Sequence, residues 1–231
     1  MRDIKTRIEH LEHLVDDLLA EAKGRGASAA EAGVSQDAGL EVTVRMGEVE
    51  TVEHTRDNGL GITVYMALRD TVQAACNIAR HTQEDACAGL ADAALMADEV
   101  PDLDLFHPWG VTVDEAIAMA LDSERVARQL DPRIENSEGA TLSTHTGIQV
   151  YGNSHGFVGG YPSSRHSLSC AVVGLEGDAM QRDYWWTSGR ASEDLESAEE
   201  VGRKAAERTL ARLGGRKLST REAPVVFQAD M

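Results

Sequence analysis

The amino-acid sequence predicts an α+β protein in which an antiparallel sheet is covered by helices. Two observations lead to this fold class. Segments with apolar residues at every third or fourth position, typical of helices, stand apart from segments in which apolar and polar residues alternate, typical of strands. In addition, 42% of the 231 residues are hydrophobic, an ordinary fraction for a globular chain that buries a core.

Residues 3–23 are predicted to form an amphipathic helix that ends at Gly24 and Gly26, because glycine commonly terminates helices. Spacings of three and four place its apolar residues on one stripe: Ile4, Ile8, Leu11, Leu14, Val15, Leu18 and Leu19. One face of this helix is therefore expected to cover a sheet.

A meander of strands follows this helix. Alternating residues predict one strand around 40–44 and another at 61–65, with a turn at Met46-Gly47. The sequence Asp57-Asn58-Gly59 is typical of a hairpin turn. The strands and the first helix are expected to form an N-terminal α+β domain over residues 1–98.

Two helical segments and a linker are predicted next. Residues 70–81 have helical spacing, and helical composition resumes over 83–97. Residues 98–111 contain Pro101 and Pro108 together with Phe106 and Trp109. This composition predicts a linker that packs against the protein and marks a domain boundary.

The second region, residues 99–231, is predicted to be β-rich with two helices. Thr112 is expected to cap a helix over 113–130, with acidic residues in its first turn. A second helix over 195–213 is expected to begin at Ser192 or Ser197.

Six short strands separated by glycine-rich turns are predicted between these helices: 133–136, 140–145, 147–152, 156–161, 166–174 and 179–187. A further strand is predicted to begin at 224–227, four residues before the end of the chain. The second α+β region is therefore expected to be incomplete at its C-terminus.

Charge and cysteine content exclude several classes of protein. The net charge of −17 repels phosphate, so binding to nucleic acid is not expected. Cys76, Cys87 and Cys170 are odd in number and lack a CxxC spacing, so reduced thiols are expected. No apolar run approaches the roughly 20 residues of a membrane span, and the N-terminus is a charged helix, so a cytoplasmic protein without a membrane partner is expected.

The sequence contains neither HExxH nor GxxxxGK[ST]. The stretch 145–167 is the richest in functional side chains. Ser154-His155 and Arg165-His166-Ser167 are able to meet across a hairpin, which would combine a hydroxyl, an imidazole and a cation. The alternatives are a polar strand face without chemistry and a strand edge that receives an extended peptide.

Trp185 and Trp186 are adjacent on a predicted strand, so their side chains are expected on opposite faces of the sheet. One is expected to enter the core, and the other to lie in a cleft or an interface.

Five stretches together resemble the PmbA/TldD family, also called modulators of DNA gyrase, and within it the PmbA branch, or TldE. They are GEVETVEHTRDNGLGITVY (47–65), CAGLADAALMADEVPDLDLFHP (87–108), YGNSHGF (151–157), SSRHSLS (163–169) and RKLSTREAPVVF (216–227). The resemblance covers nearly the whole chain, as the N-terminal half of such a protein.

The resemblance implies one subunit of a zinc metallopeptidase. TldD and TldE proteins form a heterodimer that degrades or trims unfolded peptides, including a microcin precursor and a labile antitoxin. The HExxxH zinc motif belongs to the TldD subunit, whereas the TldE subunit helps to form the chamber that admits the peptide. The resemblance therefore implies no cofactor in this chain, zinc in a TldD-like partner, and a role in peptide maturation and proteolysis.

The chain departs from the family at two places. The C-terminal half expected after the segment APVVF is missing, and about one strand and one helical turn are missing where Leu68-Arg69-Asp70 leads into the next helix. Such a deletion is expected to leave the N-terminal sheet with an exposed edge.

The leading hypothesis from the sequence is therefore a non-catalytic PmbA/TldE-like subunit. The expected peptide-binding residues rest on local chemistry rather than on the resemblance: Asn153, Ser154, His155, Arg165, His166, Ser167, Trp185 and Trp186. No catalytic residue or metal ligand is expected. The alternatives are a stand-alone hydrolase that uses the 145–167 cluster and a protein-binding regulator of a DNA enzyme.

Overall fold

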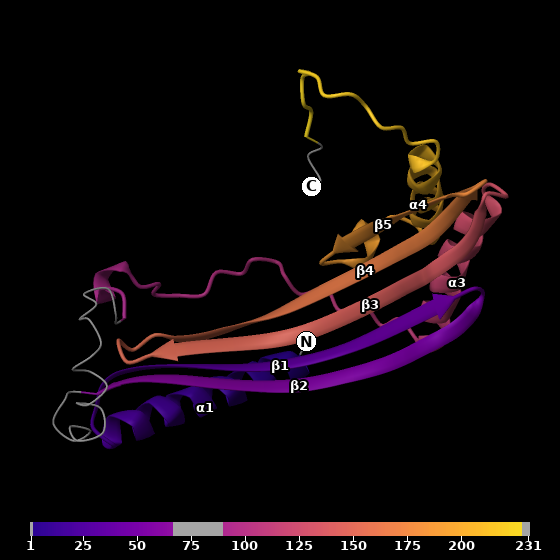
Figure 1. Cartoon of the computed structure of the whole chain (residues 1–231). Coiled ribbons are helices and arrows are strands. Elements are labelled where there is room, and N and C mark those ends of the chain that lie inside the picture. The colour runs from indigo at the N-terminus through magenta and orange to yellow at the C-terminus, as the bar shows by residue number, and fades with distance from the viewer. Residues whose placement is uncertain (1, 67–89, 228–231) are drawn as a thin grey trace.

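A computed structural model of the chain describes residues 2–66 and 90–227. Its centre is a five-stranded antiparallel sheet with the strand order β2-β1-β3-β4-β5 (Figure 1). The elements in chain order are α1 (Arg2–Gly24), β1 (Ala27–Arg45), β2 (Glu48–Met66), η1 (Ala93–Leu95), α3 (Val113–Gln129), β3 (Ile134–Asn153), β4 (Val158–Glu176), β5 (Ala179–Gly189), η2 (Ser192–Asp194) and α4 (Ala198–Arg212). The α+β class predicted from the sequence is confirmed.

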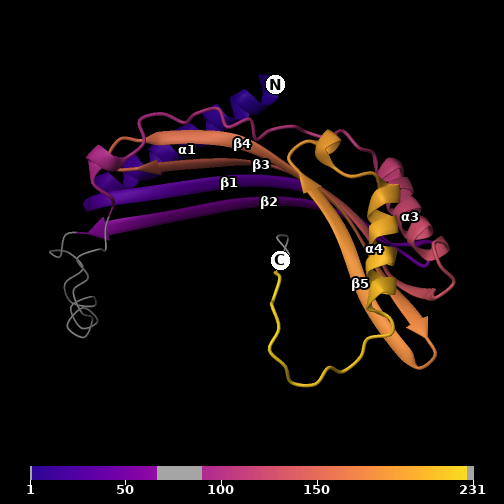
Figure 2. The same ribbon diagram turned by 90° about the horizontal axis from the view of Figure 1, so that it is seen from above.

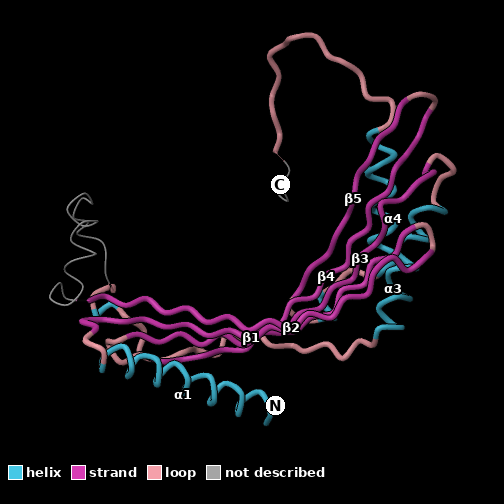
Figure 3. The backbone as a smooth tube through the Cα atoms, turned by 60° about the horizontal axis from the view of Figure 1, so that its bottom comes forward, coloured by secondary structure: helices cyan, strands magenta, loops and turns pink. Residues whose placement is uncertain are grey.

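The sheet is strongly curved, and the long helices lie on its convex face. Helix α1 runs along one half of this face, and α3 and α4 cover the other half (Figures 2 and 3). The concave face carries no helix in the part of the chain that the structure describes, although the segment after α4 crosses the space in front of it.

Two apolar clusters hold the helices against the sheet. Under α1, Leu11 and Val15 pack on Val34, Ile148 and Val150. Under α3 and α4, the buried residues are mainly small or aliphatic: Leu40, Val42, Val44, Ala116, Ala120, Ala127, Ile134, Ala140, Leu142, Leu168, Cys170, Val172, Ala198, Val201, Ala205 and Ala206. Even-numbered residues of β1 and β3 enter both clusters, so these two strands are buried on their helix-covered face near both ends. On the edge strand β2, Leu60, Ile62 and Val64 are exposed.

The helices predicted at 3–23, 113–130 and 195–213 are confirmed as α1, α3 and α4. Thr112 and Glu115 form a reciprocal capping box at the start of α3. Ser197, rather than Ser192, caps α4 through the backbone N–H of Glu200. Ser192 instead begins the short helix η2.

The hairpin predicted at Asp57-Asn58-Gly59 is wrong, because these residues lie within β2 and pair with β1. The turn that joins β1 to β2 is at Met46-Gly47, as predicted, and both residues have positive φ angles of 54° and 84°. The buried carboxylate of Glu124 on α3 accepts the backbone N–H groups of Met46 and Gly47, each at 2.7 Å.

Of the six strands predicted between residues 133 and 187, the last one, 179–187, is confirmed as β5. The division of the other five is wrong, since they merge into the two long strands β3 and β4. Gly139 and Gly147, at two of the predicted breaks, lie inside β3. A Cβ at Gly139 would lie 2.4 Å from the carbonyl oxygen of Val44, and one at Gly147 would lie 2.3 Å from Oδ1 of Asp37. These glycines serve the close approach of β1, not a change of chain direction.

The linker over 98–111 has no regular secondary structure. It packs against the protein, as predicted, and does so at β4, where the backbone N–H of Ser164 donates to the carbonyl oxygen of Leu105 at 2.8 Å. Between 90 and 97 the only helix is the three-residue η1, which is shorter than predicted. The helix predicted at 70–81, the start of the one at 83–97 and the deletion near residue 70 lie outside the described residues. The domain division at residue 98 stays a prediction.

The strand predicted at 224–227 is not formed. Pro224 to Phe227 lie in a segment without regular secondary structure, and the side chain of Val226 is 92% exposed. Within the described residues these apolar side chains find no sheet to join.

Candidate functional site

The concave side of the sheet, called the open face below, is the candidate functional surface. It is formed by the odd-numbered residues of β1, β3 and β4, because the even-numbered ones point into the core beneath the helices, and by the odd-numbered residues of β2 that pair with those of β1. Continuous pairing of β1 with β2 and with β3 brings these residues into cross-strand rows, such as Thr55, Gly39, His145 and Arg165.

The two halves of the open face differ in charge. On β1 and β2 its charged residues at positions 31–43 and 51–63 are all acidic: Glu31, Asp37, Glu41, Glu53 and Asp57. Arg45 follows at the end of β1. Asp37 lies directly opposite Asp57, and Glu41 directly opposite Glu53. On β3 and β4 the same face carries hydroxyl groups, including Ser143 and Ser167, whose oxygen atoms are 2.8 Å apart.

A shallow groove of 510 Å³ crosses four strands of the open face. Gly33 and Gly61 are paired in its floor, and Tyr151 and Tyr161 stand beside them from β3 and β4. The hydroxyl of Tyr151 donates to Glu31 at 3.0 Å, and that of Tyr161 donates to Gln149 at 2.9 Å. These hydrogen bonds fix both rings, so the groove is formed before any ligand arrives.

The predicted site residues Asn153, Ser154 and His155 form the turn between β3 and β4. Oδ1 of Asn153 accepts the backbone N–H of His155, and Oγ of Ser154 accepts the backbone N–H of Ala30. The side chain of Asn153 is buried, whereas those of Ser154 and His155 are exposed. Asn153 and Ser154 also line a second hollow of 380 Å³ beside the end of α1.

His166 is fully buried on the helix-covered side and fixes the linker. One ring nitrogen, Nε2, lies 2.9 Å from the carbonyl oxygen of His107 and must donate to it, so Nδ1 accepts from Thr144 at 2.7 Å when the ring is neutral. Trp109 packs edge-on against this ring. Ser164 has a similar role, because its hydroxyl accepts the backbone N–H of His107.

Arg165 and Ser167 point the other way, onto the open face, because they alternate with Ser164 and His166 along β4. Nε of Arg165 donates to Ser188 on β5 at 3.2 Å. Arg165 pairs with His145, eight residues along β3 from Asn153, which corresponds to about 27 Å. The predicted meeting of Ser154-His155 with Arg165-His166-Ser167 is therefore wrong, and the geometry that a stand-alone hydrolase needs is not formed.

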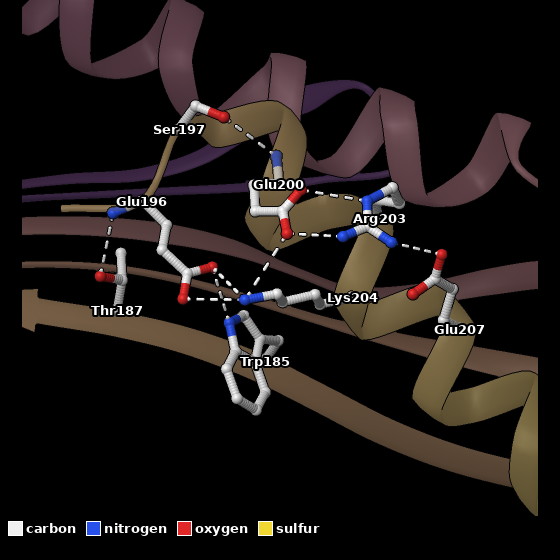
Figure 4. Close-up of polar contacts among 8 residues, drawn as sticks. All are labelled: Trp185, Thr187, Glu196, Ser197, Glu200, Arg203, Lys204 and Glu207. Atoms are coloured by element: carbon white, nitrogen blue, oxygen red, sulfur yellow. Dashed lines mark hydrogen bonds and ion pairs between the residues drawn. The ribbon is translucent and has the colours of Figure 1, made fainter.

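Trp185 and Trp186 lie on opposite faces of β5, as predicted. Trp185 packs under α4, and its Nε1 donates to Glu196 at 3.1 Å (Figure 4). Nζ of Lys204 lies 4.9 Å from the centroid of the Trp185 ring. Glu196 and Lys204 form an ion pair at 3.0 Å beside the ring. Trp186 is half-exposed on the open face. Of this pair, only Trp186 is accessible to a ligand on that face.

Two buried titratable groups lie near α4 without facing the open side. Burial alone would raise the pKa of Asp183, but hydrogen bonds from the Tyr184 amide and Arg212, with the charges of Arg208 and Arg212, hold that pKa below its usual value. Burial raises the pKa of the Cys170 thiol to about 12. Cys170 therefore stays a neutral thiol in the core.

No three His, Cys, Asp or Glu side chains among residues 2–66 and 90–227 come together closely enough to hold a metal ion. In the same part of the chain, no helix has the length and apolar character needed to cross a membrane.

Sequence reasoning missed the glycine floor and the acidic half of the open face. Gly59 and Gly61 were interpreted as part of a hairpin and a separate strand, although they lie opposite Ser35 and Gly33. The signal was present in the odd positions of residues 31–43, which are polar or glycine throughout.

Two family models match most of the chain. The PmbA/TldA metallopeptidase domain 1 matches residues 30–79, and the PmbA/TldA metallopeptidase central domain matches residues 106–213. The chain belongs to the PmbA/TldD family. The first model ends beyond β2, and the second covers β3, β4, β5, α3 and α4, so both halves of the open face lie in regions typical of this family.

Relatives within the PmbA/TldD family are similar over nearly the whole chain. Metalloprotease PmbA of Escherichia coli O157:H7 is 49% identical, with 96% of this chain and 52% of that protein covered. A PmbA homologue of Haemophilus influenzae is 43% identical, with 99% and 54% covered. This chain therefore spans about half the length of the curated relatives that it matches.

Solved structures of the family share the fold. A protein from Bacteroides thetaiotaomicron, described as a modulator of DNA gyrase, superposes with a TM-score of 0.76 at 24% identity over 89% of this chain and 51% of that one. TldE from Thermococcus kodakarensis gives a TM-score of 0.59 at 14% identity over 84% and 47%.

Proposed function

We propose that this chain is part of a cytoplasmic PmbA/TldE-like subunit of a zinc metallopeptidase and that its open face helps to form the chamber that admits unfolded peptide. In this proposal the chain is non-catalytic, and a TldD-like partner supplies the zinc. Membership of the PmbA/TldD family supports a peptidase-type function. The curated relatives are about twice as long as this chain, so a peptidase activity of the whole protein is proposed here and not shown.

The observation that carries the proposal is the contrast between the two faces of one sheet. A face that spans four long strands and carries hydroxyl, carboxylate and aromatic side chains is held rigid by helices on its other side. Such a surface offers fixed polar contacts to an extended chain without needing to move. Arg165, Ser167 and Trp186 belong to this face, so their predicted peptide-binding role fits its geometry.

Each group that the proposal gives to this chain has a simple task. Hydroxyl groups of Ser143 and Ser167 donate to or accept from peptide amides, and the half-exposed ring of Trp186 packs against apolar side chains. Zinc would activate the attacking water in the partner. No residue described in this chain is assigned a proton transfer.

The experiment that tests the proposal is reconstitution with a TldD-type protein from the same organism. The chain and the partner are purified alone and together, and cleavage of an unfolded peptide is measured with and without a chelator. The proposal expects a stable complex and cleavage by the mixture that the chelator abolishes. Cleavage by this chain alone would contradict its non-catalytic role, and failure to form a complex would contradict its role as a subunit.

A further inference from the structure

The groove beside Tyr151 and Tyr161 has a part of its floor, formed by Gly33 and Gly61, that carries no side chains. Gly33 and Gly61 lie opposite one another there, and a Cβ at Gly61 would meet no atom within 4 Å. A ligand can therefore lie directly on the backbone of β1 and β2. The two rings are only partly exposed, at 39% and 38%, so they present aromatic walls rather than loose side chains.

Carboxylates stand at both ends of this groove. Glu31 is one same-face position before Gly33 along β1, and Asp37 is one position beyond Ser35, each step being about 7 Å. Asp57 lies directly opposite Asp37 on β2. Like charges in such a pair repel one another, and neither carboxylate forms an ion pair within the described residues. A cation from outside the chain would relieve this repulsion.

We propose that the groove binds a basic segment of an extended peptide, with an arginine or lysine side chain lying over Gly33 and Gly61 and its cationic end near Asp37 and Asp57. The charge of the surface supports this choice of ligand, because the odd positions 31–43 of β1 and 51–63 of β2 carry five carboxylates and no lysine or arginine. The inference rests on the proposed function, in which the open face receives peptide.

The shape of the groove supports the same ligand. The aliphatic stem of arginine is long and thin, so it fits a floor without side chains, and its planar guanidinium stacks on tyrosine rings. A carboxylate-bearing peptide would be repelled by all five acidic residues of this half of the open face. The groove therefore selects by charge as well as by shape.

The test uses a fluorescent ten-residue peptide of glycine and serine with two arginines, and a second peptide in which citrulline replaces both arginines. Citrulline keeps the shape and loses the charge. Binding of each peptide to the full chain is measured by fluorescence anisotropy at low salt. We expect the arginine peptide to bind about tenfold more tightly, and this ratio to fall as salt is added.

Two variants of the groove separate charge from shape. D37N/D57N is expected to bring the ratio between the two peptides close to one, whereas D178N/E199Q, which changes the net charge equally at two exposed sites elsewhere, keeps it. Gly61→Leu fills the floor and is expected to weaken arginine peptide binding about tenfold or more. Gly24→Leu, at the end of α1 where a Cβ also meets nothing within 4 Å, is expected to leave binding unchanged.

Equal binding of the two peptides, no effect of Gly61→Leu, or no binding up to 1 mM peptide (roughly the weak end of specific recognition) would each overturn the inference. Circular dichroism of each variant identifies any loss of fold. These outcomes do not decide the proposed function, because zinc-dependent cleavage by the mixture with a TldD-type partner is measured separately on peptides without basic residues.

Discussion

The same strands form both faces of the sheet, but the two faces have different roles. On the helix-covered face, alternate residues of β1 and β3 are small or aliphatic and leave no room for change. On the open face, the residues between them are mostly polar, acidic or glycine, and Gly61 on the neighbouring strand β2 faces open space. The period of two therefore separates residues that hold the fold from residues that are free to bind.

The same separation occurs within single motifs. In SSRHS, Ser164 and His166 fix the linker, while Arg165 and Ser167 reach the open face. In the tryptophan pair, Trp185 holds α4 and Trp186 is half-exposed. A stretch rich in functional side chains is thus partly structural, and the strand register decides which part.

The largest expected difference in stability is between two glycine-to-alanine substitutions, one on each face of the sheet. A Cβ at Gly202 on α4 would lie 2.1 Å from the carbonyl oxygen of Ser123 on α3, so Gly202→Ala must push the helices apart. We expect a loss of about 3 kcal/mol in the free energy of unfolding. Gly61→Ala on the open face is expected to cost nothing, since its Cβ meets open space. Urea unfolding of both variants checks this, and equal losses would contradict it.

The next largest effect on stability is expected from removing the buried carboxylate of Glu124 on the helix-covered side. Glu124 is 1% exposed and accepts two backbone N–H groups at the β1–β2 turn. Glu124→Ala leaves both donors without this partner and is expected to lower the free energy of unfolding by about 2 kcal/mol. Glu135→Ala, at an exposed position of β3, serves as the matched control and is expected to change it by less than about 0.5 kcal/mol. A Glu124→Ala variant as stable as this control would show that the turn holds without the carboxylate.

The depressed pKa of Asp183 makes the covered side sensitive to acid. Because its folded pKa lies below the unfolded value, its stabilising contribution is present above about pH 4 and is lost as the pH falls through the folded pKa. Arg208 and Arg212 are partly exposed, so the contribution is discounted for screening to about 1 kcal/mol. Asp183→Asn should therefore be less stable than the parent at pH 7, and the difference should shrink as the pH falls below about 4. A difference that does not depend on pH would contradict this.

Neutralising one carboxylate of the open face should have the smallest effect and the opposite sign. Asp57→Asn removes the repulsion with Asp37 across the strands, so a gain of about 0.3 kcal/mol is expected. The gain should shrink at high salt. Thermal unfolding at two salt concentrations measures it, and a clear loss of stability would mean that this pair has a cation partner within the chain.

The helices were predictable because their signals are local. The apolar stripe of α1, Thr112 with Glu115, and Ser197 each act within a few residues of the element that they start or stabilise. The alternation of Trp185 and Trp186 follows equally from one strand.

The strand lengths were not predictable from local signals. Asp57-Asn58-Gly59 has turn chemistry, yet pairing with β1 over nineteen-residue strands overrides it. Gly139 was assigned to a turn between two predicted strands because glycine favours turns, whereas here it lies within β3 and admits atoms of β1. The prediction that Ser154 and Arg165 meet was wrong for the same reason, because only the pairing register of β3 and β4 shows how far apart these residues lie.

Photo-crosslinking tests the central claim, that the open face receives peptide, most directly. An unfolded peptide that carries a benzophenone group is irradiated with the full chain, and the attachment sites are mapped by mass spectrometry. The account predicts attachment on the open face, around Tyr151, Tyr161 and Trp186. Attachment confined to the outer surfaces of α1, α3 and α4 would contradict it.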